Sequence, residues 1–285
     1  MSLDPFDEQN LGSQAMSPRI SEFRRLHETG CFVIPNPWDR GSAVYLEALG
    51  FKALASTSAG FAWSTGCPDN AVPVEQVLEH LAEIAGSVGV PVNADFEGGF
   101  AKEPRGVAAN VTRAVKTGIA GLSIEDSTGD AHNPLFDFPL AVERIEAARA
   151  AIDKSGSGVL LTGRSEGFFA GRPDIKETIK RLEAYAAAGA DVLYAPGIRS
   201  KQDISAVVKA VAPKPVNLLV GGNWITVAEA AALGVRRISV GGALARSAWS
   251  GFAKAAKEIA DNGSFSGLAS AGPSVNLNEL FRRAS

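Results

Sequence analysis

Two short segments of the chain concentrate acidic residues. The segment PVNADFEGGF contains Asp95 and Glu97, and the segment GLSIED ends in Glu125 and Asp126. Asn93 adds an amide oxygen to the first segment. Crowded carboxylates raise each other's pKa unless a cation neutralises them, and hard oxygen ligands select Mg2+ or Mn2+. Single acids of this kind often only cap the helices that follow them, but the clustering favours a metal site.

An arginine follows the apolar run VLLT, where a lone guanidinium would be costly unless it were paired. This residue, Arg164, can form a structural ion pair with Glu125 or Glu166. It can equally bind a substrate carboxylate through two parallel hydrogen bonds. The spacing leaves both roles open.

A polar turn with the sequence TSAG offers hydroxyl and backbone N–H groups that suit a carboxylate or an enolate oxygen. Its first three members, which we predict to bind substrate, are Thr57, Ser58 and Ala59. Such turns are also common after strands, so the turn by itself is weak evidence. Asn217 is a further predicted substrate-binding residue, and Trp38 either walls the pocket or packs in the core.

The remaining reactive side chains are few. His132 is the only imidazole near the predicted site and can act as a general acid or base, or lie exposed on a loop. We place His27 and His80 on helix surfaces and assign them no role. Cys31 and Cys67 lack metal-ligand spacing and are too few for a disulfide framework.

The elements that must position these residues are eight short apolar runs, each followed by a helical stretch. The predicted strands are Phe32–Pro35, Lys52–Ser56, Pro91–Asp95, Gly121–Glu125, Val159–Thr162, Val192–Ala195, Val216–Leu219 and Arg237–Val240. Eight alternations with strands apolar enough to be buried on both faces predict a single closed (β/α)8 barrel of the TIM type. An open doubly wound sheet is the alternative. In a barrel the acids, the TSAG turn and Arg164 would all stand at the rim formed by the strand C-termini.

Two helices can be outlined in detail. From Val74 to Val88 apolar residues repeat at three-and-four spacing, which predicts an amphipathic helix. Asp174 is the expected N-cap of another helix, with Glu177 placed for a capping box and Gly189 placed to end it. We expect residues 1–30 to form a leader and a first helix, with 1–15 outside the fold, residues 31–262 to form the barrel, and residues 263–285 to form a short helical extension.

The composition limits the partners. With 285 residues, 46% of them hydrophobic, and a formal net charge of -3, the chain resembles a globular protein and lacks the basic excess of a nucleic-acid binder. It has no apolar run of the length that spans a membrane and no signal-peptide core. We therefore expect a cytoplasmic enzyme that acts on small molecules.

Taken together, these residues resemble those of the isocitrate lyase and phosphoenolpyruvate mutase superfamily. The resemblance covers about Phe32 to Ala260 and is carried by PNPWDRGSA, FKALASTSAGFAWSTGCPD, PVNADFEGGF, GLSIED, TGRSEGF, AAAGADVLYAPG and PVNLL. It implies Mg2+, or Mn2+, held directly or through water by residues matching Asp95 and Glu125, where the position of Asn93 is usually an aspartate. It also implies that Arg164 and the TSAG turn hold the substrate carboxylate, and that Asp69 lies beside the metal. Homo-oligomers, dimers or tetramers with exchanged C-terminal helices, are usual for the superfamily.

The loop after Asp126 departs from the superfamily. It reads DSTGDAHNP and contains neither the catalytic cysteine of isocitrate and methylisocitrate lyases nor the lysine of phosphoenolpyruvate mutases. These two activities are therefore not expected. The prediction is a Mg2+-dependent lyase that cleaves a carbon–carbon bond of a small 2-oxo or 2-hydroxy (di)carboxylate through a pyruvate-like enolate, as an oxaloacetate decarboxylase or hydrolase does.

Three alternatives stay open. One is a mutase or hydrolase acting on a P–C bond. A second is a phosphorylated substrate bound by the glycine pairs at Gly221–Gly222 and Gly241–Gly242, because such pairs after the last two strands commonly hold phosphate in barrels. The third is a barrel that binds a carboxylate without catalysis, which the change at Asn93 and the altered loop would suit.

Overall fold

The computed structural model describes residues 16–269 and 276–283. Eight strands form one sheet in the order β1-β8-β7-β6-β5-β4-β3-β2, and every ladder in it is parallel. They are β1 (Phe32–Ile34), β2 (Leu54–Ala55), β3 (Val92–Asp95), β4 (Gly121–Glu125), β5 (Leu160–Arg164), β6 (Val192–Tyr194), β7 (Val216–Leu219) and β8 (Arg237–Ser239). All eight predicted strands are confirmed, although β2 is shorter than expected and β5 extends to Arg164.

The two end strands meet and close the sheet. Ala55 N of β2 donates to the carbonyl of Pro35, directly after β1, at 3.0 Å. The side chain of Asn36 reinforces this junction by donating to Ser56 O at 3.0 Å. The sheet is therefore a (β/α)8 barrel, and the alternative of an open doubly wound sheet is wrong.

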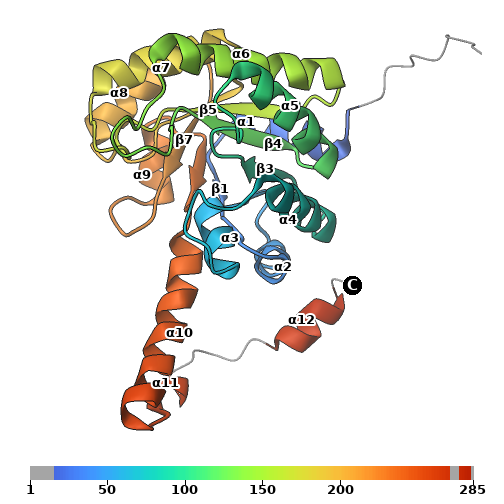
Figure 1. Ribbon diagram of the computed structural model, residues 1–285, viewed down its shortest axis with the longest axis vertical. Coiled ribbons are helices and arrows are strands. Elements are labelled where there is room, and N and C mark those ends of the chain that lie inside the picture. The colour runs from blue at the N-terminus through green and yellow to red at the C-terminus, as the bar shows by residue number, and fades with distance from the viewer. Residues whose placement is uncertain (1–15, 270–275, 284–285) are drawn as a thin grey trace, which may run out of the picture.

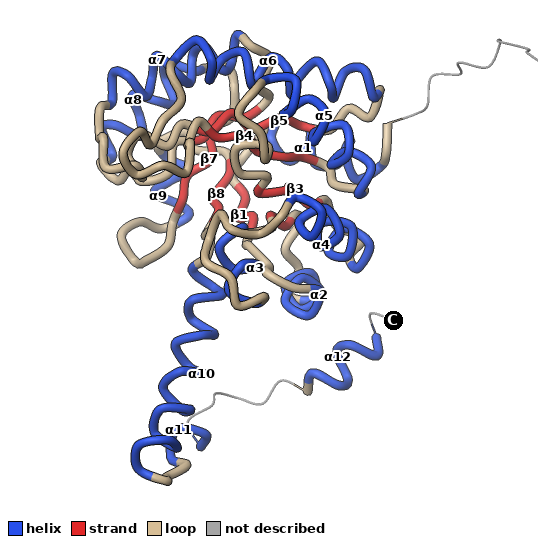
Figure 2. The backbone as a smooth tube through the Cα atoms, in the orientation of Figure 1, coloured by secondary structure: helices blue, strands red, loops and turns tan. Residues whose placement is uncertain are grey.

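Helices surround the barrel, as Figures 1 and 2 show. They are α1 (Pro18–Glu28), α2 (Arg40–Ala48), α3 (Ser58–Ser64), α4 (Val74–Ser87), α5 (Pro104–Ala114) with the 3-10 turn η1 (Val115–Thr117), α6 (Phe138–Ser155), α7 (Ile175–Ala187), α8 (Lys201–Val211), α9 (Val227–Ala232), α10 (Ala243–Asn262), α11 (Ser266–Ala269) and α12 (Leu277–Arg283). None of the helices in residues 16–269 and 276–283 is long and apolar enough to cross a membrane. The expectation for residues 1–15 falls outside the described residues.

The C-terminal part leaves the barrel. In Figure 1, α10 projects away from the barrel, and α12 returns to lie near α2. The ring of Phe281 on α12 reaches to 3.7 Å from the position that a Cβ on Gly41 would take. The predicted short helical extension is thus present as α11 and α12.

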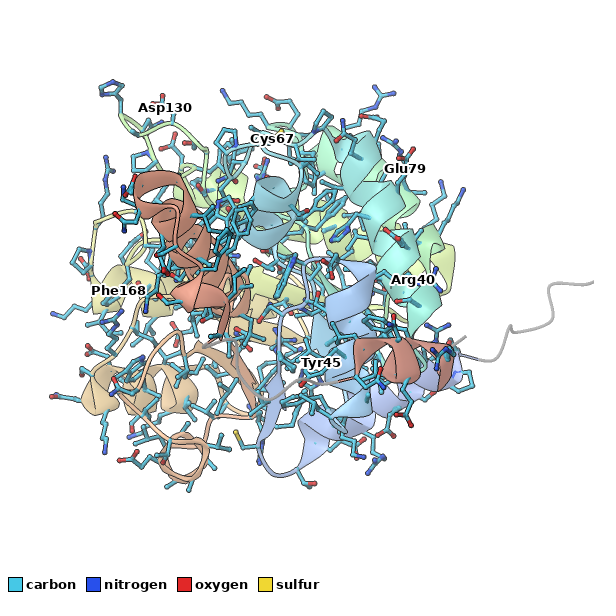
Figure 3. All side chains as sticks on the ribbon, turned by 90° about the horizontal axis from the view of Figure 1, so that it is seen from below. Arg40, Tyr45, Cys67, Glu79, Asp130 and Phe168 are labelled. Atoms are coloured by element: carbon cyan, nitrogen blue, oxygen red, sulfur yellow. The ribbon has the colours of Figure 1, made fainter. Side chains whose placement is uncertain are left out.

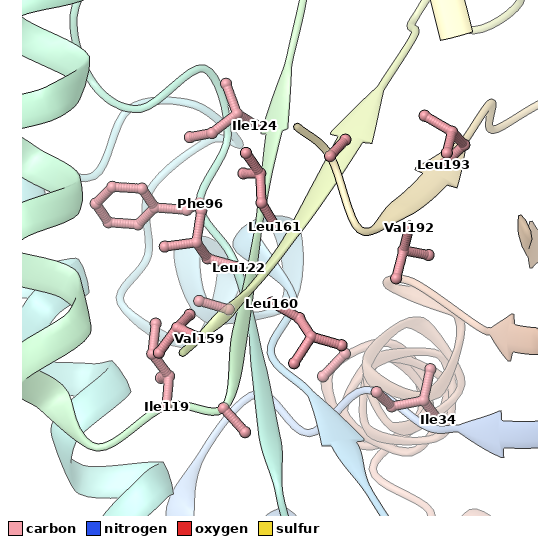
Figure 4. Packing of buried hydrophobic residues seen from close by; sticks show 14 of the residues in the cluster. Ile34, Phe96, Ile119, Leu122, Ile124, Val159, Leu160, Leu161, Val192 and Leu193 are labelled. Carbon is pink, nitrogen blue, oxygen red and sulfur yellow. The ribbon is translucent and has the colours of Figure 1, made fainter. Parts of the chain in front are cut away.

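Apolar side chains pack between the sheet and the helices. Phe96, Leu122 and Ile124 are buried, and Figure 4 shows Phe96 directed from the end of β3 toward the flanking helices. Because side chains alternate along a strand, Asn93 and Asp95 then face the interior of the barrel. The alternation along β3 is what brings polar residues to the inside.

The interior of the barrel below the rim of strand C-termini is polar rather than apolar. Arg237 of β8 is 3% exposed, and its Nε donates to Asn217 Oδ1 at 2.8 Å while Nη2 donates to Thr162 Oγ1 at 3.2 Å. Its Nη1 lies 3.5 Å from Nε2 of His27, a residue of α1. Burial and the charge of Arg237 lower the pKa of His27 to about 3, so this imidazole is neutral and can accept from the guanidinium.

Two details of the sequence interpretation are corrected. His27 and His80 are buried instead of lying on helix surfaces. His80 of α4 stacks on Phe61 with ring centroids 3.7 Å apart, because an imidazole at this position covers the aromatic face of α3. Glu177 does not complete a capping box; its carboxylate accepts from Arg181 Nε at 2.9 Å instead.

The N-cap predicted for α7 is confirmed and can be tested. Asp174 accepts from Lys176 N at 2.9 Å and from Glu177 N at 3.1 Å. Asp174→Ala should lower the free energy of unfolding by about 1 kcal/mol, because two helix N–H groups lose their acceptor. Urea denaturation measures the change. Glu79→Ala, at an exposed site on α4, is the control and should stay within about 0.5 kcal/mol of the parent; equal effects of both variants would contradict the assignment.

Candidate active site

A half-buried guanidinium lies at the centre of the barrel rim. Nη1 of Arg164, at the end of β5, lies 3.2 Å from Asp95 Oδ1 and 3.1 Å from Glu125 Oε2. Its Nε donates to Glu166, and its Cζ lies 5.2 Å from the centre of the Tyr194 ring. One cation thus pairs with three carboxylates supplied by β3, β4 and the end of β5. The ion pair predicted for Arg164 exists, with both of its predicted partners.

The TSAG turn is tied to the same cluster. Asp95 Oδ2 accepts from Ser58 N at 3.0 Å and from Ser58 Oγ at 2.9 Å. Thr57 is buried and caps α3 by accepting from Gly60 N at 3.3 Å. Trp38 packs on this turn, since a Cβ added to Gly60 would lie 2.9 Å from the Trp38 Cβ. Of these residues, Ser58 directly contacts the acidic cluster.

Two more acids share this rim. Burial, followed by the charges of Asp95 and Asp69, raises the pKa of Glu97 to about 8. The pKa of Asp69 is also raised, by loss of water and by Asp95. Burial likewise raises the pKa of Glu125, against the lowering effect of Arg164. The rim therefore holds more carboxyl groups than the single guanidinium can pair with, and burial favours the protonated form of Glu97.

The backbone around Glu97 is strained and is held by hydrogen bonds from another helix. Glu97 and Phe100 have positive φ angles of 46° and 54°, which are uncommon for side-chain-bearing residues. Arg144 of α6, 1% exposed, holds this loop by donating to three of its carbonyls, including Lys102 O at 2.6 Å. The Arg144 guanidinium also stacks 4.0 Å above the ring of Phe136. Glu97 is thus positioned by an arginine from a distant helix.

The sequence placed Glu97 in the acidic cluster and Glu166 as a possible partner of Arg164, but it gave no role to Arg144. The tertiary contacts show that Glu166 pairs with Arg164 and that Arg144 holds the loop of Glu97. Arg144 carries a sequence signal: it shares the buried face of α6 with Ala141, Ile145 and Ala148, where a charged residue needs a specific partner.

Asp126 does not join the other acids. Its Oδ2 accepts from Tyr185 OH at 2.6 Å and from Arg181 Nη1 at 3.1 Å, both on α7. Its Oδ1 accepts from Glu166 N at 2.7 Å. Because Asp126 follows Glu125 directly, its side chain points to the helix side of the strand. It fixes the loop that carries Glu166, and its inclusion in the carboxylate cluster was wrong.

Asn93 and Asn217 lie deeper in the barrel than Asp95. Both line a cavity of about 40 Å3 beneath Arg164. Asn93 Oδ1 is buried without a hydrogen-bond partner among the described residues, while its amide nitrogen donates to Ala94 O at 3.1 Å. Asn217 accepts from Arg237 and donates to Ser239 Oγ at 2.9 Å. Both the oxygen and the nitrogen of the Asn217 amide therefore already form hydrogen bonds within the protein.

The loop after β4 folds back on itself. Ser127 and Leu135 form an antiparallel bridge, and Thr128 N donates to Pro134 O at 3.0 Å. His132 is exposed on this loop, and Figure 3 shows its neighbour Asp130 at the edge of the molecule. The structure thus brings Ser58, Asp69, Asp95, Glu125 and Arg164 together and leaves His132 apart from them.

The rim residues suit a hard divalent cation in their chemistry. Carboxylate oxygens are the ligands that Mg2+ and Mn2+ prefer. Burial and then neighbouring carboxylates raise the pKa of Glu97, and burial raises that of Glu125, so a bound cation would favour the ionised form of both groups. Within residues 16–269 and 276–283, no three His, Cys, Asp or Glu side chains already converge as metal ligands. Arg164 lies between Asp95 and Glu125 instead. The residue types of this donor set fit the ion, while their side chains are arranged around Arg164.

The glycine pair after β8, Gly241–Gly242, offers less to a phosphate than the sequence suggested. The backbone N–H groups of Val240 and Gly241 both donate to Asn36 Oδ1 at 2.9 Å. Gly242 packs against Trp63, whose ring lies 3.3 Å from the position of an added Cβ. These glycines thus serve the packing of α10 and the closure of the barrel.

The family follows from comparison with known proteins. A family model described as phosphoenolpyruvate phosphomutase matches residues 23–260. The chain belongs to this family. As a phosphoenolpyruvate phosphomutase family member it falls within the isocitrate lyase and phosphoenolpyruvate mutase superfamily, as the sequence motifs indicated.

Relatives of this family member include lyases and hydrolases. An oxaloacetate decarboxylase of Paraburkholderia xenovorans (strain LB400) is 30% identical over 241 residues, which cover 80% of this chain and 76% of that protein. A lyase/mutase structure from Burkholderia cenocepacia J2315 is 46% identical with a TM-score of 0.89, covering 93% of this chain and 96% of that one. Oxaloacetate acetylhydrolase in complex with oxalate is 29% identical with a TM-score of 0.81, covering 93% of each chain. This protein is accordingly an enzyme, and the alternative of a non-catalytic barrel is not supported.

The raised pKa of Glu97 predicts a pH dependence of stability. Because the folded protein keeps a proton on Glu97 that the unfolded chain releases near its ordinary pKa of 4.5, stability should fall as the pH rises from about 5 to about 8 and then level off. Glu97→Gln should flatten this decline. Urea midpoints measured across this pH range in EDTA test it, with Glu103→Gln, an exposed acid of the same loop, as control. An unchanged slope in Glu97→Gln would contradict the prediction.

Proposed function

We propose that this protein is a Mg2+-dependent lyase that cleaves a carbon–carbon bond of a small 2-oxo or 2-hydroxy carboxylic acid, as an oxaloacetate decarboxylase does. The observation that carries the proposal is the pairing of Arg164 with Asp95 and Glu125 at the barrel rim. This arrangement keeps a carboxylate-binding cation next to the acids suited to a metal. The relationship to oxaloacetate decarboxylase and oxaloacetate acetylhydrolase supports the same class of substrate.

Asp95 and Glu125 would hold the ion, Mg2+ or Mn2+, and Asn93 offers its unpartnered amide oxygen from the layer below. When bound, the ion supplies Lewis-acid polarisation of the oxygen on the second carbon of the substrate. Asp69 stands beside this group, where its charge adds to that of Asp95.

Arg164 would then bind the substrate carboxylate. If Asp95 and Glu125 held the ion, the guanidinium would be left without two of its three carboxylate partners, and a substrate carboxylate would take their place. Glu166 keeps the guanidinium in place through Nε. The Thr57–Ala59 turn supplies hydroxyl and N–H donors on the neighbouring strand end.

The chemistry of a 2-oxo acid such as oxaloacetate follows from this placement. Breaking the C3–C4 bond releases carbon dioxide and leaves the electron pair on a pyruvate-type enolate, which a proton at C3 converts to product. The donors around Arg164 and the Thr57–Ala59 turn stabilise the negative charge as it moves to the enolate oxygen. His132 lies exposed on the loop after β4, so we assign it no contact with the reacting atoms.

The test is metal-dependent turnover. Purified protein should convert at least one member of a panel of 2-oxo acids and substituted malates with Mg2+ and lose this activity in EDTA. Asp95→Asn should lower kcat/KM by about 100-fold or more, because it removes the negative charge of a proposed metal ligand. Asp203→Asn, in the first turn of α8, is the control. Equal turnover by Asp95→Asn and wild type, or turnover that EDTA leaves unchanged, would refute the proposal.

We also propose that the enzyme works as a homo-oligomer, a dimer or a tetramer. Of the 20 residues of α10 only Ala245 is buried, and Trp249 and Phe252 are 42% and 64% exposed. Their rings contact each other, 5.4 Å apart, and so form a continuous apolar surface. Exposed apolar surface of this kind is typical of protein interfaces.

Light scattering coupled to gel filtration tests the assembly. The wild type should elute as a multiple of the chain mass, and the double variant Trp249→Glu, Phe252→Glu should shift toward the monomer. Lys254→Ala on the same helix is the control. A monomeric wild type, or an unchanged mass of the double variant, would disprove this assembly.

A further inference from the structure

A large and a small cavity adjoin the Arg164 cluster. The large cavity, of about 560 Å3, lies between the loops after β3 and β4, and Glu97 and Glu125 belong to its lining. The small cavity, of about 40 Å3, lies beneath Arg164 in the barrel interior and is lined by Arg237 of β8. A volume of this size holds a water molecule or a small ion but no whole substrate. The small cavity is the one whose lining contains a charge that the rest of the chain leaves unbalanced.

Arg237 is a buried cation without an acidic partner. It is 3% exposed, and its hydrogen-bonding partners among the described residues are the amide of Asn217, the hydroxyl of Thr162 and the neutral imidazole of His27. Burial lowers the pKa of Arg237 to about 10, and the opposing effect comes from Tyr194 and from no carboxylate. The guanidinium is therefore charged in a place that offers it no countercharge.

The other two buried arginines of the described chain are better compensated. Arg181 forms ion pairs with Asp126 at 3.1 Å and with Glu177 at 2.9 Å. Arg144 donates to three backbone carbonyl groups, and nearby carboxylates raise its pKa against the effect of burial. A buried charge without such partners is strongly unfavourable. Arg237 therefore calls for an acceptor from outside the chain.

The lining of the small cavity carries a net positive charge. Its charged members are the guanidinium groups of Arg164 and Arg237 and the carboxylate of Asp95. Both oxygens of this carboxylate already accept hydrogen bonds, one from Arg164 and the other from Ser58. Arg237 has five N–H donors, of which three have acceptors among the described residues. Two donors of a full positive charge remain for a ligand.

Hydroxyl groups in the lining add further donors. Ser56 Oγ accepts from Asp95 N at 2.9 Å, so its own O–H is available. Tyr194 and Ser239 share a hydrogen bond, which leaves one of their two hydroxyl protons for another acceptor. The amide oxygen of Asn93 also belongs to this layer, but it faces β4. Water can accept from these donors as well, but only an anion also neutralises the charge.

We propose that the small cavity binds a monovalent inorganic anion of the size of chloride, held by Arg237 and the neighbouring hydroxyl groups. The ion offsets the cost of burying Arg237. Because it binds the folded barrel and not the unfolded chain, it stabilises the fold. The inference does not rest on the proposed function, since it assigns the ion no part in the reaction.

Diffraction from crystals of the wild type soaked in sodium bromide tests the position of the ion. Bromide replaces chloride, and its anomalous scattering distinguishes it from water. We expect a bromide peak in the small cavity, within hydrogen-bonding distance of Nη1 or Nη2 of Arg237. Bromide peaks elsewhere on the protein with none in this cavity would overturn the proposal.

Thermal unfolding tests the binding in solution. The midpoint is measured in EDTA with sodium chloride or sodium gluconate at equal ionic strength, since gluconate is too large for a cavity of about 40 Å3. Chloride should raise the midpoint by about 2 °C or more as it saturates the site. Equal midpoints in the two salts would reduce a bromide peak to an adventitious ion only and would overturn the proposal.

A pair of neighbouring arginines supplies the variant and its control. Arg237→Met removes the charge and keeps an unbranched side chain, so the midpoint should no longer differ between the two salts. Arg236→Met is the control, because Arg236 points away from the cavity and donates to Gly30 O at 3.0 Å. It should keep the chloride dependence of the wild type. Retention of this dependence in Arg237→Met, or its loss in both variants, would contradict the assignment; if Arg237→Met does not fold, the bromide position in the wild type decides.

Discussion

The pairing of Arg164 with Asp95, Glu125 and Glu166 is the interaction on which the candidate site depends. Carboxylates from three neighbouring strand ends approach one another only because a guanidinium lies between them. A buried charge without a partner is strongly unfavourable, so each member of the cluster holds the others in place. The parallel barrel makes this possible, since its strands end at the same rim.

A second set of basic residues supports this rim from the helix side. Arg181 and Tyr185 of α7 bind Asp126 and thereby fix the segment that carries Glu166. Arg144 of α6 binds the carbonyls of the loop that carries Glu97. The positive φ of Glu97 can persist because these contacts outweigh the local cost. The rim acids are thus positioned by hydrogen bonds to residues far away in sequence.

The carboxylate cluster and the cavity beside it are formed by different parts of the molecule. The carboxylate cluster at the strand ends is suited to the chemistry that the family shares, whereas the two loops after β3 and β4 form the cavity beside it. The β4 loop lacks the cysteine and the lysine of the better-known family reactions, and its polar residues line that cavity instead.

Much of this could be predicted from the sequence. The eight apolar runs and the helices between them predicted the barrel, because a strand buried on both faces has a recognisable composition. The positions of Asp95, Glu125 and Arg164 at strand ends predicted where they meet, because the rim of a barrel is defined by its topology. The family motifs agreed with both.

Other features were decided only by the tertiary structure. Asp126 follows Glu125 in the chain, yet it points to α7, since neighbouring residues of a strand face opposite sides. Glu97 and Arg144 are 47 positions apart, and only the packing of α6 on α5 brings the arginine under the loop. His80 was expected at the surface because periodicity reports the average face of a helix and not the aromatic ring that covers one position. Residue types and strand order therefore determined the acidic rim, while side-chain direction and contacts between distant helices decided which acids belong to it.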